Sequence, residues 1–146
     1  MRVSTKGRYG LRVMVELALR EGTGPVQVTA IASSQDLPPK YIHVLVGGLK
    51  AAGLVTAQRG PSGGLELARE ASRITVLDVV EALEGPVRPV DCGEGPEACR
   101  RSGDCVTVDV WRELGEAMEG ALRRHTLADL AERARTRGET GNAWMI

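Results

Sequence analysis

The chain is poor in aromatic residues, which make up only 3% of its 146 residues, and phenylalanine is absent. A densely packed core must then be built from aliphatic side chains, and the hydrophobic fraction of 42% is enough to supply them. No apolar run reaches the length of about 18 residues that a membrane-spanning helix needs, so none is predicted. The first residues also lack the apolar stretch of a secretory signal peptide, and we therefore expect a cytoplasmic protein.

Motifs that would identify an enzyme are missing as well. The sequence shows no phosphate-binding P-loop, no dinucleotide-binding glycine fingerprint and no Ser, His and Asp in a triad order. The cysteine spacing does not match a thioredoxin-type redox pair either. We therefore predict that the protein is not an enzyme. An inert protein-interaction domain is a further alternative, which failure to bind any palindromic DNA would favour.

Acidic and basic residues balance overall, with 19 of each, but they are unevenly placed along the chain. Residues 1–70 carry nine Lys and Arg against five Asp and Glu, a net charge of 9 − 5 = +4. Residues 71–146 carry ten Lys and Arg against fourteen Asp and Glu, a net charge of 10 − 14 = −4. A basic first half suggests a polyanionic partner there. A solvated surface can show the same split by chance, so the asymmetry supports DNA binding only together with a motif.

Hydrophobic spacing predicts three helices followed by a β-hairpin in the first half of the chain. The helices are expected from Thr5 to about Arg20, from 29 to 35, and from Pro39 to just before Gly53. The hairpin would pair 54–58 with 65–68 across a Gly- and Pro-rich tip. This order is that of a winged helix-turn-helix, a fold that is mainly α with a small β-hairpin wing (α+β). A further helix, started by a capping box at Thr75 and Asp78, should end at Gly85.

In such a fold the third helix is the natural reader of the DNA major groove, and the hairpin tip lies near the minor groove. Lys40 and His43 are candidates for contacts with base edges or phosphates, and Val44 for an apolar contact. Tyr41 suits a DNA backbone contact and a place in the core equally well. The remaining candidates are Arg59, Gly60 and Ser62 at the tip and Lys6, Arg8 and Tyr9 near the N-terminus. Alternatively, the tip glycines only make the turn and the N-terminal cations are an ordinary solvated surface.

All three cysteines, Cys92, Cys99 and Cys105, lie in one acidic, glycine-rich segment. Thiolates that converge from a loop suit a soft metal or an iron–sulfur cluster. A disulfide would leave one thiol over, and a tetrahedral metal site would lack one ligand. Zinc is disfavoured because the segment has no Cys-x2-Cys pair, but a thiol redox switch and a protein partner stay open.

A long helix is predicted from about 106 to 124. Its apolar residues are spaced alternately by three and four positions, which is the pattern of a helix that pairs with another helix. The members of this seam are Trp111, Leu114, Met118 and Ala121, with His125 at the next position. We therefore expect a homodimer. A short helix at about 127–135 follows, and the tail from Thr136 onward is predicted to be disordered.

Four motifs occur in order before the cysteines: MRVSTKGRYG at the start, Leu37-Pro-x-x-Tyr41-Ile42, Gly53-Leu54-Val55, and Arg59-Gly60-Pro61-x-Gly63-Gly64. Together they resemble the Rrf-type family of bacterial winged-helix transcriptional regulators, which includes IscR-like and NsrR-like iron–sulfur sensors and CymR-like regulators. The resemblance implies a homodimeric repressor on a pseudopalindromic double-stranded operator. It also implies an iron–sulfur cluster, of the 2Fe–2S type, on the three cysteines, whose state sets the affinity for DNA. The alternative is a cluster-free, CymR-like regulator that acts through thiol redox, zinc or a protein partner.

The fourth ligand of such a cluster is not evident. The IscR-like pattern has a histidine three residues after the third cysteine, where this chain has Val108. Some NsrR-like members take an acidic ligand from the partner's first helix, at the position of Arg8 here. Neither side chain can ligate iron. The remaining candidates are a water, a small thiol, or one of Asp91, Glu94, Glu97 and Asp104.

These predictions divide the chain into four parts. Residues 1–85 form the winged helix-turn-helix domain, and 86–105 form the cysteine-bearing cluster loop. Residues 106–135 hold the dimerisation helix and the short C-terminal helix, and 136–146 form the tail.

Overall fold

The computed structural model describes residues 3–91, 97, 99–101 and 103–139. Along the chain the elements are α1 (Thr5–Leu19), α2 (Val28–Gln35), α3 (Pro39–Ala51), β1 (Val55–Gln58), β2 (Gly64–Leu67), a 3-10 helix η1 (Ala71–Arg73), α4 (Val76–Glu84), α5 (Val108–Arg123) and α6 (Leu127–Glu139). The predicted fold, mainly helical with one small antiparallel hairpin, is confirmed. No helix in these ranges is both long and apolar enough to cross a bilayer.

Helices α1 and α4 begin at side-chain caps. The Ser4 hydroxyl accepts hydrogen bonds from the backbone N–H groups of Lys6 at 3.1 Å and Gly7 at 3.4 Å. In α4, Thr75 Oγ1 accepts from the Asp78 N–H at 3.1 Å while Asp78 Oδ2 accepts from the Thr75 N–H at 2.8 Å. These side chains satisfy amides that have no partner within the helix, which fixes the first turn of each.

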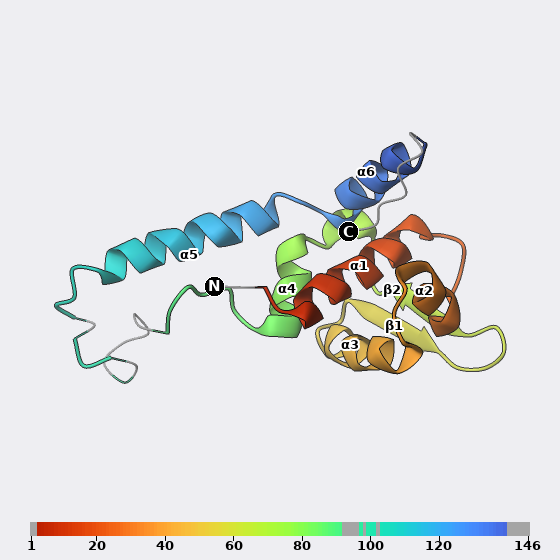
Figure 1. Ribbon diagram of the computed structural model, residues 1–146, viewed down its shortest axis with the longest axis horizontal. Coiled ribbons are helices and arrows are strands. Elements are labelled where there is room, and N and C mark those ends of the chain that lie inside the picture. Colours follow the sequence, from red (N-terminus) through yellow and green to blue (C-terminus); the bar gives the residue numbers. More distant parts are fainter. Residues whose placement is uncertain (1–2, 92–96, 98, 102, 140–146) are drawn as a thin grey trace.

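The core is aliphatic, as the composition requires. Its largest fully buried side chains are Met14, Ile31, Ile42, Leu45, Leu49, Leu54, Ile74 and Leu127. They come from α1, α2, α3, the start of the hairpin, the segment between η1 and α4 and, less expectedly, α6. Leu127 and Ala131 of α6 are 0% and 1% exposed, so α6 packs back onto α1 as part of the helical body (Figure 1).

The hairpin is joined to the helices by one isolated β-bridge. β1 and β2 pair antiparallel, with Val55 opposite Leu67. Val26, two residues before α2, forms a further bridge with Leu65, with N···O distances of 2.9 and 2.8 Å. This bridge fixes the wing to the start of the helix-turn-helix unit.

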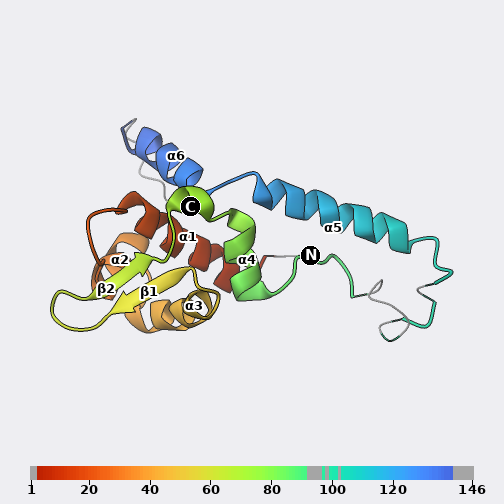
Figure 2. The ribbon, with the colours of Figure 1, turned by 180° about the vertical axis from the view of Figure 1, so that it is seen from behind.

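Helix α5 projects from the helical body as an arm (Figures 1 and 2). Its C-terminal end lies near the body, and its N-terminal end, with the segment that carries the last cysteines, lies farthest away (Figure 2). Near the body, Met118 and Leu122 pack against a second apolar cluster formed by Val76, Leu77, Val80 and Val87. Farther out, Gly115 is buried close to Pro89, and Trp111 lines a hollow beside Val87 and Pro89.

The C-terminal helix is longer than the sequence predicts. We expected α6 to end at about Arg135, but it continues to Glu139. An Arg135–Glu132 ion pair at 3.2 Å and a hydrogen bond from Thr136 Oγ1 to the Glu132 carbonyl at 3.1 Å accompany these last turns. Residues 136–139 of the predicted tail are therefore helical, and 140–146 lie outside the described residues.

Candidate nucleic-acid interface and cysteine segment

The first turns of α3 present polar and apolar side chains to solvent. Lys40, His43 and Val44 are exposed, Val44 by 59%. The opposite face of the helix is buried through Ile42, Leu45, Val46 and Leu49. The structure therefore places these three candidate contacts together on one accessible surface.

The turn between α2 and α3 is held by its own backbone. Asp36 adopts a left-handed conformation with φ 51° and ψ 51°, which aspartate tolerates better than most residues. The Leu37 N–H donates to the Ala32 carbonyl at 3.0 Å, which closes the end of α2. Pro39 then starts α3 with its φ already suited to a helix. Helices two and three thus form the predicted helix-turn-helix.

Tyr41 is half-buried and packs against the main core. Its ring meets the ring of Tyr9 from α1 edge to face, with centroids 6.1 Å apart and an interplanar angle of 90°. The packing role considered for Tyr41 is therefore present in the structure. Its contact with a DNA backbone stays a prediction.

The hairpin tip is exposed at Arg59, Gly60 and Ser62. Gly60 has a φ of +101°, a conformation that side-chain-bearing residues rarely adopt. Its carbonyl accepts a hydrogen bond from the Gly63 N–H at 3.0 Å. Gln27, at the start of α2, donates from Nε2 to the Pro61 carbonyl at 3.4 Å, so the tip lies beside the helix-turn-helix unit.

The N-terminal candidates lie in the first turns of α1. Arg8 is exposed and Lys6 is half-buried. The Arg8 guanidinium stands 5.9 Å from the centroid of the Tyr9 ring, and Tyr9 in turn touches Tyr41 of α3. Arg8 and the start of α3 are thus connected through two aromatic rings.

A buried polar network was missed by the sequence reasoning. Gln35 and Glu16 are only 5% and 7% exposed, and Gln35 Nε2 donates to Glu16 Oε2 at 2.9 Å. Arg12 donates to the Gln35 side chain at 3.0 Å and to its carbonyl at 2.7 Å, while Arg20 pairs with Glu16 at 2.6 Å. The network ties α1 to the end of α2. Its one visible signal was the spacing of Arg12, Glu16 and Arg20 by four residues on a helix.

The cysteine segment is only partly described. Cys92 and Glu94 lie outside the described residues; Cys99 and Cys105 are half-buried free thiols. Cys105 Sγ and Thr107 Oγ1 share a hydrogen bond at 3.1 Å. This bond, together with the Thr107 N–H, lowers the pKa of the Cys105 thiol and so favours its thiolate. Among the described residues, no three His, Cys, Asp or Glu side chains gather closely enough to hold a metal ion.

The predicted dimer seam divides into two halves. Trp111 and Leu114, on the outer part of α5, are 36% and 43% exposed, and Val110 beside them is 55% exposed. Met118 and Ala121 are half-buried, Met118 against α4 of its own chain. His125 lies beyond the end of α5, and its ring Nδ1 is 3.3 Å from Arg133 Nη2. Within the described ranges, the exposed apolar side chains of the seam therefore lie on the outer half of the arm.

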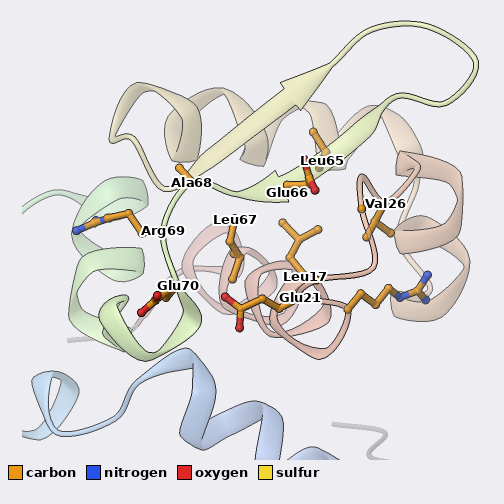
Figure 3. Close-up of a pocket in the computed structure, with 12 residues that line it drawn as sticks. Leu17, Glu21, Val26, Leu65, Glu66, Leu67, Ala68, Arg69 and Glu70 are labelled. Atoms are coloured by element: carbon orange, nitrogen blue, oxygen red, sulfur yellow. The ribbon is translucent and has the colours of Figure 1, made fainter.

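A pocket of about 290 Å³ lies between the end of α1 and β2 (Figure 3). Its polar wall includes Glu21, Arg69 and Glu70, and Glu21 Oε1 accepts a hydrogen bond from the Ala71 N–H at 2.9 Å. It contains none of the predicted DNA-binding or cysteine residues. We therefore assign it no part in the site.

The sequence and fold match known regulators over most of the chain. Residues 3–133 match the family model Rrf2, described as an iron-dependent transcriptional regulator. The chain is 40% identical to the HTH-type transcriptional regulator CymR of Bacillus subtilis, over 90% of each chain. It is 37% identical to the regulator IscR of Klebsiella pneumoniae, over 89% of this chain and 79% of that one. The solved structure of CymR, the global cysteine regulator of B. subtilis, superimposes with a TM-score of 0.75 at 39% identity, covering 91% and 98% of the two chains.

Proposed function

The chain belongs to the Rrf2 family of transcriptional regulators, and from this premise we propose that it is a homodimeric, cytoplasmic repressor whose affinity for operator DNA is set by its cysteines. The observation that carries the DNA-binding part is the exposed start of α3, together with a hairpin tip tied to the helix-turn-helix. Lys40, His43 and Val44 face solvent, and Gln27 links the tip to the start of α2. A helix and a wing so joined can enter adjacent grooves of one duplex.

The proposed contacts have separate roles. Lys40, His43 and Val44 read base edges in the major groove, with the Tyr41 hydroxyl at the backbone. Arg59, with Gly60 and Ser62, approaches the minor groove. Lys6 and Arg8 bind phosphates, which position the protein without reading sequence. In a dimer the two α3 helices should lie about one helical turn of DNA apart, roughly 34 Å, so the operator is a pseudopalindrome.

We further propose that Cys92, Cys99 and Cys105 hold an iron–sulfur cluster, of the 2Fe–2S type. Three thiolates in one segment are the ligands that such a cluster prefers, and the lowered pKa of Cys105 favours the form that ligates. A bound cluster supplies redox and ligand-exchange chemistry. The segment leads directly into α5, so ordering of the segment can change how the two DNA-binding units are spaced.

The second candidate is a cluster-free regulator that senses through thiol redox, zinc or a protein partner. It is favoured by the similarity to CymR. The two half-buried free thiols, Cys99 and Cys105, would then be the redox-active groups.

The DNA-binding proposal is tested by selecting duplexes from a random pool with the purified protein. We expect a pseudopalindromic sequence, and we expect Arg59→Ala to relax its preference at one position beside the minor groove. Arg69→Ala, an exposed arginine at the other end of the hairpin, is the matched control. An unchanged sequence profile for Arg59→Ala would remove Arg59 from the reading residues.

The cluster proposal is tested by anaerobic purification with visible spectroscopy and counts of iron, sulfide and zinc. A brown protein with iron and sulfide in equal amounts supports the cluster. Cys92→Ala should lose it while the dimer persists. A colourless, iron-free protein after reconstitution points to the cluster-free candidate, and mass spectrometry after peroxide treatment then tests for a disulfide.

A further inference from the structure

The first turn of α1 carries basic residues where helices usually carry acidic ones. It contains Lys6 and Arg8 and no Asp or Glu. The N-terminus of a helix bears a partial positive charge, which repels cations and attracts anions. Such a turn suits contact with DNA phosphates, but it needs a negative charge nearby to be stable without DNA.

Glu84, the last residue of α4, supplies that charge from a distant part of the chain. Its Oε1 accepts hydrogen bonds from the backbone N–H of Ser4 at 3.1 Å and of Gly7 at 2.9 Å. The same oxygen accepts a hydrogen bond from the Ser4 hydroxyl. One carboxylate oxygen therefore holds the cap and the first turn of α1 together.

Two glycines on one face of α1 make this approach possible. A Cβ added at Gly7 would collide with Glu84 Oε1, and one added at Gly10 would collide with the Leu83 side chain. The last turn of α4 thus lies against α1 closely enough that neither position accepts a side chain without a shift. The contact depends on residues from both helices.

We propose that Glu84 is a positioning residue for DNA binding. Its carboxylate fixes the first turn of α1 on α4, and so holds Lys6 and Arg8 where they meet the phosphates. The inference rests on the DNA contacts proposed above for these two residues. We expect no contact between Glu84 itself and DNA, because its negative carboxylate and the negative phosphates repel each other.

The direction of the change in DNA affinity distinguishes a positioning role of Glu84 from simple repulsion between its carboxylate and DNA. An exposed carboxylate near DNA opposes binding, so removing one that has no other role should leave affinity unchanged or raise it. Removing one that positions phosphate contacts should lower it. Glu81, one turn earlier on α4, provides the control because it is exposed and its side chain makes no hydrogen bond or ion pair with a described residue.

The test measures affinity for the palindromic duplex selected by the unaltered protein, over a range of salt concentrations. Glu84→Ala should weaken binding by about tenfold or more, the factor expected when charge-assisted hydrogen bonds no longer fix a contact. The slope of log affinity against log salt should also fall, by about 0.9 for each phosphate that the variant no longer neutralises. Glu84→Gln keeps an acceptor oxygen but loses the charge, so it should restore only part of the affinity. Glu81→Ala should bind as tightly as the unaltered protein or slightly more tightly.

Gly7→Ala tests the same contact without removing any charge. Alanine is a better helix former than glycine, so this variant should stay folded. Its methyl group displaces the Glu84 carboxylate, and binding should weaken as it does in Glu84→Ala. The two substitutions combined should weaken binding no more than either alone, because both break one contact.

Two results would overturn the inference. One is a folded Glu84→Ala protein that binds DNA as tightly as the Glu81→Ala control, while Lys6→Ala still lowers both the affinity and the salt slope. In that case the proposed function stands and only the role of Glu84 is refuted. The other is a Lys6→Ala and an Arg8→Ala protein that both keep the full affinity and slope. In that case the phosphate contacts themselves are refuted, and the role of Glu84 with them.

Discussion

Replacing Gln35 by alanine should destabilise the protein much more than replacing its exposed neighbour Ser34. The Gln35 side chain is buried at the junction of α1 and α2, where Nε2 donates to the buried Glu16 carboxylate at 2.9 Å. A hydrogen bond to a charged group contributes about 1.5–3 kcal/mol, and truncation also removes a buried methylene worth about 0.8 kcal/mol. We therefore expect a loss of about 2–4 kcal/mol in the free energy of unfolding.

The assay is urea unfolding followed by circular dichroism, at one fixed protein concentration because dimerisation contributes to the apparent stability. Ser34→Ala is the matched control. Ser34 is exposed and its hydroxyl bonds only the Ile31 carbonyl, at 3.1 Å, so a loss of about 0.5 kcal/mol or less is expected. A Glu16→Ala, Gln35→Ala double-mutant cycle should show a coupling of at least about 1 kcal/mol. Equal losses in the free energy of unfolding for Gln35→Ala and Ser34→Ala would show that the buried Gln35–Glu16 hydrogen bond does not stabilise the protein.

Three other perturbations test separate parts of the molecule. A Cβ at Gly64 would collide with the Val26 carbonyl, so Gly64→Ala should cost about 1–3 kcal/mol in urea unfolding and loosen the wing; an unchanged midpoint would contradict this. Leu114→Lys places a charge on the exposed outer face of α5 and should convert the dimer to monomer in sedimentation experiments, whereas a persisting dimer would move the interface elsewhere. The N–H and hydroxyl of Thr126 lower the pKa of Asp129 below its usual 3.8, so the stability that this carboxylate adds is present above about pH 4 and is lost as the pH falls through the lowered value. Asp129→Asn should therefore lower the melting temperature at pH 7, and the difference should shrink as the pH falls below about 4.

Local sequence signals predicted the fold well because they act within a few residues. The capping box at Thr75, the proline at the start of α3 and the glycine-rich hairpin tip each determine a boundary through residues close in sequence. The aliphatic core followed from the helical spacing of its members. The exposed position of Lys40, His43 and Val44 followed from the same spacing.

Contacts between distant parts of the chain could not be predicted in this way. Nothing near Glu84 in the sequence indicates that its carboxylate caps a helix 80 residues earlier. The pairing of Gln35 with Glu16 depends on how α1 crosses α2, which no single-helix pattern contains. The return of α6 onto α1 likewise depends on the turn before Leu127, which the helical spacing does not contain.

We propose that the state of the three cysteines sets the affinity for operator DNA. The most direct test of this proposal measures binding to the selected duplex on one anaerobic sample, before and after removal of iron, with iron and sulfide counted in each state. We expect about two irons and two sulfides per chain before removal, as a 2Fe–2S cluster requires. Their removal should change the affinity for DNA by about tenfold or more, within the range typical of coupled sites. Iron-free protein throughout, or equal affinity with and without iron, would contradict it.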